Sequence, residues 1–324
     1  MKVLVTGAGG FVGRHLLTHL RTNTDIELYG TLVSEAERQP ELVALCPALH
    51  VLDLREPEAV RDLLATIKPD QIFHLAGQAY VPRSFEDPWE TLENNIRGTL
   101  NLLQSLHDLD LPSRILVVGS AEIYGSVQPD KLPVNEDTPF APSSPYSVSK
   151  IAQDMLALQY ALAYNIFTVR VRPFNHIGPG QNDRFSVSNW AKQIVGAELG
   201  QREAVIYVGN LAAARDFTDV RDVVRAYSAL LVHSVAGEVY NVCSGQAHSM
   251  QSILETLIGY SKVPIEIRVE ADRFRPVEIP IMTGDNSRLR RATGWQPQIP
   301  IEQSVRDVLD EWRQRISTEI TKPL

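Results

Sequence analysis

Three residues of this chain have types and spacing that could carry out carbonyl chemistry: Ser120, Tyr146 and Lys150. A tyrosine hydroxyl is a weak acid, and a neighbouring ammonium favours its phenolate and lowers the tyrosine pKa toward neutral pH. Tyr146 could then donate or accept a proton. The Ser120 hydroxyl could hydrogen-bond the oxygen on which negative charge develops. Together the three side chains predict interconversion of a carbonyl and an alcohol.

A strand and a helix are expected to position these side chains. Ser120 follows the apolar run 115–118, which is typical of a buried parallel strand, so its hydroxyl should lie at that strand's carboxyl end. Ligands bind at this edge of open α/β sheets. Tyr146 and Lys150 are four residues apart in a segment that opens with Ser144 and a proline, a favourable helix start. Both side chains should share one helix face, although the pair alone also fits an exposed helix surface.

Composition and charge limit the class of protein. The chain has 324 residues, 44% of them apolar, with a net charge of −8 and a pI of about 5.5. This is ample for a large core and argues against a nucleic acid or an anionic membrane as partner. Two cysteines, Cys46 and Cys243, make a disulfide framework unexpected. The amino terminus lacks the apolar core of a signal peptide, so we expect a cytoplasmic protein. The eight histidines show no ligand spacing, so we expect no metal.

A glycine-rich turn near the amino terminus is expected to bind a hydride carrier. The apolar strand that begins at Lys2 runs into glycines spaced G-x-x-G-x-x-G and then into a helical pattern. Such glycines allow a tight turn, close approach of the backbone to a pyrophosphate and close packing of helix on strand, while the helix N-terminus attracts phosphate. The cofactor contacts assigned to this turn are Gly7, Gly10, Phe11, Val12 and Gly13.

The tip of the second expected strand, residues 26–32, bears on the choice of coenzyme. An acidic residue at this tip selects NAD, whereas a basic residue admits the additional phosphate of NADP. The tip reads Leu-Val-Ser followed by Glu35, with Arg38 shortly after. The sequence is therefore ambiguous. NADP(H) is slightly favoured because no aspartate lies at the tip, and NAD(H) stays open because Glu35 could serve it.

Two further strands should also border the cofactor. The strand 49–52 ends in Asp53, which could bind the adenine or cap the following helix. The strand from Gln71 ends in small residues that leave room for a cofactor, and His74 within it is expected to be packed rather than catalytic. Asn95 should face the sheet, where it could fix a backbone carbonyl or a water, or be a buried structural asparagine. The cofactor contacts assigned here are Asp53, Leu54, Leu75, Ala76 and Gly77, in addition to Tyr146 and Lys150.

The alternation of strands and helices through residue 172 predicts right-handed βαβ units and a parallel sheet. The glycine motif, the HLAG strand end, the NNIRGT segment and the serine, tyrosine and lysine together resemble the extended short-chain dehydrogenase/reductase family. The resemblance covers nearly the whole chain. It implies a Rossmann-type doubly wound parallel sheet with a smaller α/β substrate-binding lobe, and a homodimer formed through a four-helix bundle. By this resemblance residues 1–172 and 217–243 form the NAD(P)-binding domain, and residues 173–216 and 244–324 form the nucleotide-sugar-binding lobe.

The second half of the chain carries arginines suited to a diphosphate. The strand 166–171 leads into a polar loop, residues 172–181, at a strand's carboxyl end, where loops usually carry function. Two irregular segments further on contain Arg215, Arg273 and Arg275. A planar guanidinium can make bidentate contacts with phosphate oxygens, although each arginine alone also fits a surface charge.

Four strings of the second half resemble one branch of the family, the reductases that act on GDP-4-dehydro-6-deoxy-D-mannose: FNHIGPGQ, VGNLAAARDFTDVRDVV, YNVCSG and RPVEIPIMTGDNSRLRRATGW. This resemblance implies NAD(P)H-dependent reduction of the C4 keto group to give GDP-D-rhamnose. Tyr146 would protonate the new alkoxide, Lys150 would hold the nicotinamide ribose, and Ser120 would bind the carbonyl oxygen. The implied contacts of the GDP-linked sugar are Ser84, Asn175, Arg215 and Arg275.

Two alternatives remain open. The first is a GDP-mannose 4,6-dehydratase or another nucleotide-sugar dehydratase or epimerase of the same family. Dehydration needs an additional acid and base to remove water across C5 and C6. Ala121, directly after Ser120, cannot transfer a proton, whereas Glu122 could act as the base. The second alternative is a non-catalytic cofactor-binding regulator, and the presence of both Tyr146 and Lys150 weighs against it.

Overall fold

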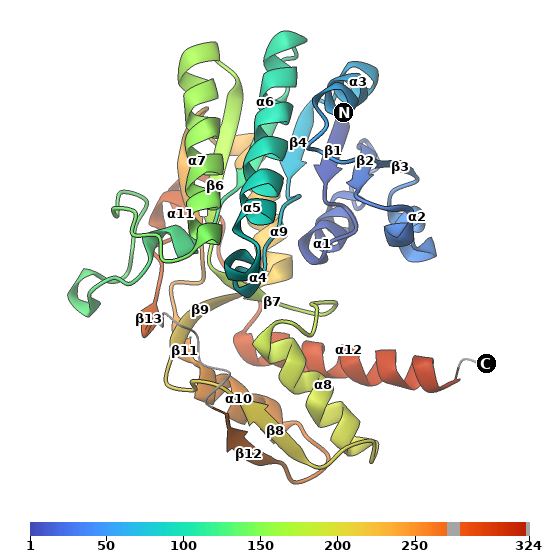
Figure 1. Cartoon of the computed structure of the whole chain (residues 1–324), viewed down its shortest axis with the longest axis vertical. Coiled ribbons are helices and arrows are strands. Elements are labelled where there is room, and N and C mark those ends of the chain that lie inside the picture. Colours follow the sequence, from blue (N-terminus) through green and yellow to red (C-terminus); the bar gives the residue numbers. More distant parts are fainter. Residues whose placement is uncertain (271–278, 322–324) are drawn as a thin grey trace.

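Seven parallel strands form the central sheet of the structure, a computed structural model that describes residues 1–270 and 279–321, with side chains as far as residue 318. The strand order is β10-β6-β5-β4-β1-β2-β3 (Figure 1). The strands are β1 (Lys2–Thr6), β2 (Glu27–Leu32), β3 (Ala48–Val51), β4 (Gln71–His74), β5 (Arg114–Val118), β6 (Phe167–Pro173) and β10 (Val239–Val242). Because all seven are parallel, their carboxyl ends meet at one edge, where Ser120 follows β5.

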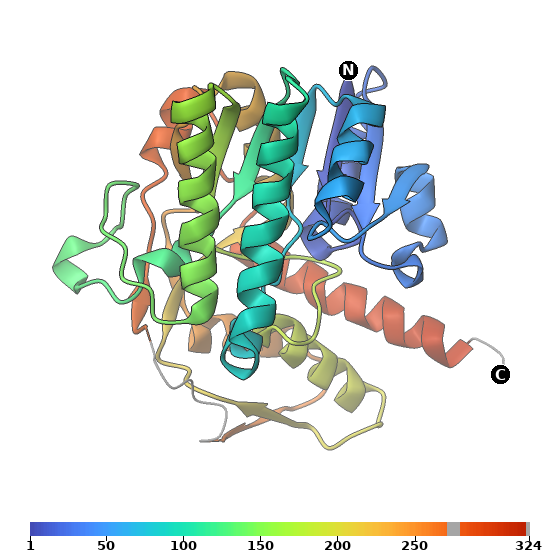
Figure 2. The same cartoon turned by 45° about the horizontal axis from the view of Figure 1, so that its top comes forward.

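Helices cover both faces of this sheet. On one face α3 packs against α6 and α6 against α7, whereas α1 packs against α9 on the other (Figures 1 and 2). An apolar cluster lies on each face. This confirms the predicted Rossmann-type doubly wound fold. The helices of this region are α1 (Phe11–Leu20), α2 (Pro40–Leu45), α3 (Pro57–Ile67), α4 (Val81–Glu86), α5 (Pro88–Leu92), α6 (Gly98–Asp108), α7 (Pro145–Tyr164) and α9 (Val220–His233).

A smaller α/β lobe is built from later segments and has an apolar core of its own. The helices are α8 (Ser186–Glu198), α10 (Met250–Gly259) and α12 (Ile301–Thr321). The strands are β7 (Asn175–Ile177), β8 (Val205–Val208), β9 (Ala214–Asp219), β11 (Ala247–Ser249), β12 (Glu266–Val269) and β13 (Ile281–Met282). β9 lies between β11 and β13 and also pairs with β7, while β8 pairs with β12. The core between these helices and β8 includes Trp190, Ile206 and Trp312.

The chain crosses between the two regions more than once. It leaves β9 in the lobe, forms α9 on the large sheet and then adds β10 beside β6. A later helix, α11 (Ser287–Thr293), packs against α9 and β10, and Leu289 and Trp295 lie in the core of the large sheet. This segment was assigned to the lobe from the sequence. The exact division into domains stays a proposal.

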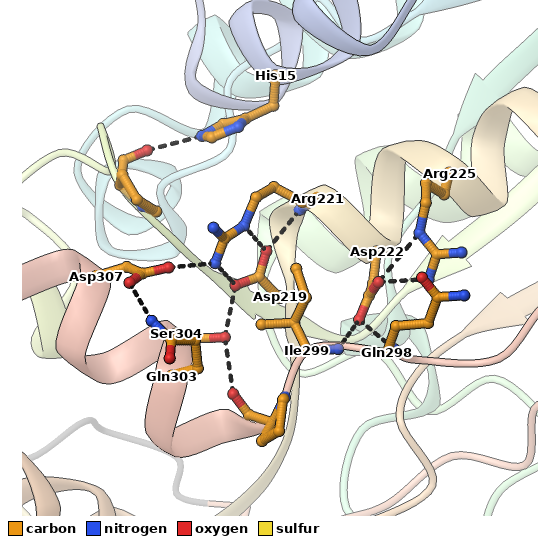
Figure 3. A network of polar contacts seen from close by, with 12 residues as sticks. His15, Asp219, Arg221, Asp222, Arg225, Gln298, Ile299, Gln303, Ser304 and Asp307 are labelled. Carbon is orange, nitrogen blue, oxygen red and sulfur yellow. Dashed lines mark hydrogen bonds and ion pairs between the residues drawn. The ribbon is translucent and has the colours of Figure 1, made fainter.

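A network of carboxylates joins α12 to the start of α9 (Figure 3). Asp219 ends β9 and caps α9, where its carboxylate accepts the backbone N–H of Arg221 at 2.8 Å. The Arg221 guanidinium binds both Asp219, at 2.7 Å, and Asp307 of α12, at 2.6 Å. The Ser304 hydroxyl donates to Asp219 at 2.6 Å. Because the Asp219 side chain is fully buried, these bonds replace its lost hydration and fix α12 beside α9.

Asp222 anchors the segment that precedes α12. Its Oδ2 accepts the backbone N–H groups of Gln298 at 2.8 Å and of Ile299 at 2.9 Å, and its Oδ1 binds Arg225 (Figure 3). The carboxylate is almost completely buried. A single side chain of α9 therefore holds both the chain entering α12 and a guanidinium of its own helix.

We predict that Asp222→Ala lowers the free energy of unfolding by roughly 3 kcal/mol, because two backbone N–H groups lose their acceptor and a guanidinium loses its partner. The matched control is Asp137→Ala. Asp137 is 78% exposed and pairs with Arg288 at the surface, so its loss should cost less than about 1 kcal/mol. Urea denaturation of both variants measures the difference, and equal losses would contradict the role given to Asp222.

Candidate active site

The turn between β1 and α1 is shaped for a ligand that lies against backbone. Gly7 has φ +67°, a left-handed conformation that favours glycine. A side chain at Gly13 would overlap the carbonyl of Gly7, and one at Gly10 would lie 3.2 Å from it. Phe11 and Val12, which begin α1, are half-buried at this turn. The turn and the helix N-terminus therefore fit the pyrophosphate of a dinucleotide, as the sequence predicts.

The ends of the neighbouring strands pack closely around this turn. A Cβ at Gly7 would lie 3.0 Å from Ala76, which with Leu75 follows β4. A Cβ at Gly77 would lie 2.7 Å from the side-chain oxygen of Asn95 and 3.8 Å from Nζ of Lys150. Glycine at position 77 thus lets the backbone after β4 approach the lysine that the sequence singles out.

Asp53 and Leu54 follow β3 at the same edge of the sheet. Asp53 does not cap α3, because its carboxylate binds Arg55 at 2.5–3.0 Å and the N-cap is Glu56. The hydrogen bonds from Arg55 lower the pKa of Asp53. Leu54 lies against Gly98 of α6. The capping alternative is therefore wrong, and contact of Asp53 and Leu54 with an adenine stays a prediction.

Ser120 leads into a short 3₁₀ turn, η3 (Ala121–Tyr124), directly after β5. Its Oγ accepts the backbone N–H of Glu122 at 3.1 Å, and its side chain is buried. Ala121 belongs to an apolar cluster that includes Phe174. Glu122, the second residue of η3, is half-buried.

Tyr146 and Lys150 lie in the first two turns of α7, which begins as predicted. Ser144 is the N-cap and its Oγ accepts the backbone N–H of Ser147 at 3.1 Å. Tyr146 and Lys150 are both buried, and Nζ of Lys150 lies 5.8 Å from the centre of the tyrosine ring. Nζ donates to the carbonyl of Val118 at 3.0 Å. The lysine is thereby held at the carboxyl end of β5, beside the phenol.

The pKa of Tyr146 differs from the sequence expectation. Burial raises it to about 12, a hydrogen bond with Ser120 lowers it, and the charge of Glu122 raises it further. Burial also lowers the pKa of Lys150 to about 8. The expectation that Lys150 brings the tyrosine pKa toward neutrality is therefore not met, because loss of hydration outweighs the other effects. At neutral pH, Tyr146 therefore keeps its proton.

A chain of buried polar groups joins the glycine-rich turn to α7. The Thr6 hydroxyl lies 2.9 Å from Nδ1 of His74, and Nε2 of His74 lies 2.9 Å from Oγ1 of Thr99. Thr99 also accepts a hydrogen bond from Gln153 of α7 at 2.6 Å. Burial lowers the pKa of His74 to about 3, so the ring is neutral. His74 is thus a packed residue, as expected, that ties β1 and β4 to the helices.

Asn95 fixes the first turn of α7 from a short π-helix, η2 (Glu93–Arg97). Its Oδ1 accepts the backbone N–H of Gln78 at 2.7 Å, and its Nδ2 donates to Ser149 at 2.8 Å. The Ser149 hydroxyl in turn donates to the carbonyl of Tyr146 at 2.7 Å. Asn95 is fully buried, and its Nδ2 also donates to the backbone carbonyl of Gln78 at 3.1 Å, so it is a structural asparagine that also fixes a backbone carbonyl, as the two alternatives from the sequence proposed.

The residues predicted to contact the sugar nucleotide lie in three different elements. Ser84 is fully buried in α4, and its hydroxyl donates to the carbonyl of Val81 at 2.7 Å. Asn175 is exposed on β7, which pairs with β9. Arg215 is half-buried on β9. The structure therefore brings Asn175 and Arg215 onto adjoining strands. Arg275, like Arg273, lies outside the described residues.

A buried ion cluster behind the site was missed in the sequence analysis. Asp154 of α7 binds Arg170 at 2.5 Å and Arg172 at 2.8 Å, and all three side chains are more than nine-tenths buried. One signal could have revealed it. The two arginines alternate in a strand that otherwise reads as buried, so they share one face, and buried guanidiniums need a carboxylate.

Metal-ligating clusters and membrane-spanning helices are absent from the part of the chain that the structure describes. In the described ranges, no three His, Cys, Asp or Glu side chains gather closely enough to hold a metal ion. No helix among the described residues is both long and apolar enough to cross a membrane. Cys46 and Cys243 are free and buried.

Comparison with known proteins gives matches over nearly the whole chain. A family profile described as GDP-mannose 4,6 dehydratase matches residues 4–308. The chain is 40% identical over 318 residues to the GDP-6-deoxy-D-mannose reductase of Pseudomonas aeruginosa, covering 98% of this chain and 99% of that protein. It is 33% identical over 312 residues to the GDP-6-deoxy-D-talose 4-dehydrogenase of Aggregatibacter actinomycetemcomitans, covering 96% of each. A solved structure of RMD from Pseudomonas aeruginosa complexed with NADPH has a TM-score of 0.86 and 40% identity, covering 97% of this chain and 99% of that chain.

The burial of the Lys150 ammonium lowers the stability of the folded protein. Lys150→Met should raise the free energy of unfolding at pH 7 by on the order of 2 kcal/mol, because the cost of burying charge exceeds the lost hydrogen bond to Val118. Below pH 8 the folded protein carries the full cost. Between about pH 8 and 10.5 folded Lys150 loses its proton while the unfolded state keeps it, so the advantage of the variant should shrink. Urea denaturation at a series of pH values measures the difference in the free energy of unfolding. A variant less stable than wild type at pH 7 would contradict the claim that burial of the Lys150 charge costs stability.

Proposed function

Because this chain belongs to the GDP-mannose 4,6 dehydratase family, we propose that it is an NAD(P)H-dependent reductase that converts the C4 keto group of GDP-4-dehydro-6-deoxy-D-mannose to the hydroxyl of GDP-D-rhamnose. The observation that favours a reductase over a dehydratase is the presence of alanine at position 121. Directly after Ser120, where an elimination would need a group that transfers protons, the chain has a methyl group packed in an apolar cluster.

The side chains of the site supply what carbonyl reduction requires. The reduced nicotinamide, when bound, supplies the hydride. Tyr146 donates its proton to the C4 oxygen, and its raised pKa keeps that proton in place at neutral pH until negative charge develops. The Ser120 hydroxyl donates a hydrogen bond to the same oxygen. The Lys150 ammonium stabilises the phenolate that remains and holds the ribose of the cofactor.

Dehydration is the competing function, and Glu122 is the observation that favours it. This carboxylate lies in η3, two residues after Ser120, and could serve as the base that removes a proton from C5. Loss of the C6 hydroxyl also needs an acid, and Ala121 cannot provide one. Reduction therefore remains the better supported function, with Glu122 acting on the charge of the site rather than on C5.

For the coenzyme we favour NADPH, with NADH as the alternative. The tip of β2 has no aspartate, and Arg38 lies just beyond it, where it pairs with Glu35 at 2.7 Å and donates to the carbonyl of Leu49 at 3.1 Å. Arg38 is held close to the strand tips at which the adenosine ribose of a dinucleotide binds. Its guanidinium could exchange Glu35 for the additional phosphate of NADP. The structure of RMD complexed with NADPH supports the same choice.

We further propose that Asn175, Arg215, Ser84 and Arg275 hold the GDP-linked sugar at the boundary between the two lobes. The division of the chain is that predicted from the sequence, with residues 1–172 and 217–243 binding the cofactor. The proposed location is the cytoplasm. Contact by Ser84 would require its hydroxyl to turn away from the carbonyl of Val81.

The proposed reaction predicts stoichiometric consumption of NADPH by the 4-keto sugar nucleotide. Tyr146→Phe should lower kcat about a hundredfold or more while NADPH binding is retained, because only the proton donor is lost. Absorbance at the nicotinamide band gives the rate, and NMR of the product gives the configuration at C4. Conversion of GDP-mannose without net loss of cofactor would instead identify a dehydratase.

A homodimer through α6 and α7 is proposed from the side chains on their outer face. The two helices lie side by side on the sheet (Figures 1 and 2). Large apolar side chains are exposed on this face and on α5 beside it: Trp89, Leu100, Val148, Leu162 and Tyr164. Pairing with the same helices of a second copy would bury them in a four-helix bundle.

Leu162→Glu should therefore shift the protein from dimer toward monomer, because a charge would be buried against a second copy. Leu162 is 76% exposed on α7. Val232→Glu is the control, since Val232 is 52% exposed on α9, which covers the opposite face. Light scattering after gel filtration gives the mass of each. A monomeric wild type, or a control that dissociates equally, would refute the bundle.

A further inference from the structure

The groups proposed to act on the carbonyl are carried by two separate elements. Ser120 is the N-cap of η3, after β5, whereas Tyr146 and Lys150 lie on α7. Proton donation and hydrogen bonding to one oxygen require both elements to be aligned to a fraction of an ångström. A contact that fixes η3 relative to α7 would therefore control the rate without touching the substrate.

Arg172 of β6 makes such a contact. Its Nε donates to Asp154 of α7 at 2.8 Å, and its Nη1 donates to the hydroxyl of Tyr124 at 2.9 Å, at the end of η3. Nη1 also donates to the carbonyl of Glu136 at 2.8 Å. The side chain is only 3% exposed. One rigid, planar guanidinium thus binds the helix of the tyrosine and the turn of the serine.

The Tyr124 hydroxyl is fully committed in this arrangement. It donates to Oδ1 of Asn241 at 2.7 Å while it accepts from Arg172. Asn241 is held in turn, because its backbone N–H donates to Glu136 and its Nδ2 donates to the carbonyl of Val134. Tyr124 is completely buried. The end of η3 therefore has one well-defined position, four residues after Ser120.

Asp154 anchors the other end of the link. It lies four residues after Lys150 on α7 and neutralises Arg170 as well as Arg172. A Cβ at Gly119 would lie 3.8 Å from Oδ2 of Asp154 and 3.0 Å from the carbonyl of Val171. The residue before Ser120 therefore packs directly on the ion cluster. Movement of η3 would have to displace charges that are held out of water.

We propose that Tyr124 is a positioning residue, which through Arg172 and Asp154 holds Ser120 in register with Tyr146. The inference rests on the proposed reduction, because it assigns Tyr124 a role in that reaction. Tyr124 touches no substrate. It acts by keeping the Ser120 hydroxyl at the distance from Tyr146 at which both can reach one oxygen.

The test is Tyr124→Phe, which keeps the ring and removes the hydroxyl. It should lower kcat for the 4-keto sugar by about tenfold or more, with KM and NADPH affinity nearly unchanged, because alignment rather than binding is lost. The matched control is Tyr160→Phe on α7, which removes the hydroxyl of a buried side chain. This hydroxyl donates to Gln104 of α6 at 2.6 Å and, within the described residues, makes no hydrogen bond to η3 or to the ion cluster. Equal kcat values for the two variants would overturn the proposal.

A double-mutant cycle separates positioning from general damage. If Tyr124 acts through Ser120, then Tyr124→Phe should change kcat less than about twofold when Ser120 is already alanine. Independent, additive effects would overturn the inference.

Hydrogen exchange of the backbone amides of residues 119–125 measures how firmly this turn is held, and it does not depend on turnover. Protection should fall in Tyr124→Phe and in Arg172→Lys, whose ammonium cannot reach both Asp154 and Tyr124, and it should stay unchanged in Tyr160→Phe. Unchanged protection in both test variants would refute the link. If the wild-type protein fails to reduce the keto sugar, only the proposed function is refuted. The hydrogen-exchange experiment still tests whether Tyr124 and Arg172 hold η3 in place, because it needs no turnover.

Discussion

The arrangement of the site depends on one interaction, the buried ion cluster of Asp154 with Arg170 and Arg172. The Asp154 carboxylate neutralises both arginines where all three side chains are removed from water. Such a cluster adds little net stability, because desolvation of the charges offsets their attraction, but it tolerates few alternative geometries. It therefore fixes α7 against β6, and through Arg172 it also fixes the turn after β5. The parallel sheet brings the strand ends to one edge, and the cluster sets the finer alignment there.

The chemistry of the site follows from burial. Loss of hydration raises the pKa of Tyr146 to about 12 and lowers the pKa of Lys150 to about 8, so both groups favour their neutral forms more than in water. A tyrosine that holds its proton suits donation to a developing alkoxide. Ala121, directly after Ser120, lies in an apolar cluster and cannot transfer a proton, so the site is better suited to supply one proton to a carbonyl than to remove water.

Much of the fold could be predicted from the sequence, because apolar runs, glycine spacing and the Ser144-Pro145 helix start report local structure directly. The spacing of four residues between Tyr146 and Lys150 on this helix likewise predicts that both lie in one region. The ion cluster was missed because hydrophobic periodicity indicates which positions are buried and not which distant charge each one meets. The tyrosine pKa was predicted in the wrong direction because a neighbouring ammonium can be read from spacing, whereas the larger cost of desolvation depends on the complete fold. The packing of Trp295 against the large sheet likewise depends on a contact distant in sequence.

The most direct test of the account is transfer of deuterium from NADPH labelled at C4 of the nicotinamide to the 4-keto sugar nucleotide. Labelled cofactor of both configurations should be supplied, because the face used is set by the site. Direct reduction predicts that one of the two labels appears at C4 of the sugar, with one cofactor oxidised for each product formed, as mass spectrometry and NMR would show. A deoxy sugar product formed without that label, and with the cofactor unchanged in amount, would contradict it.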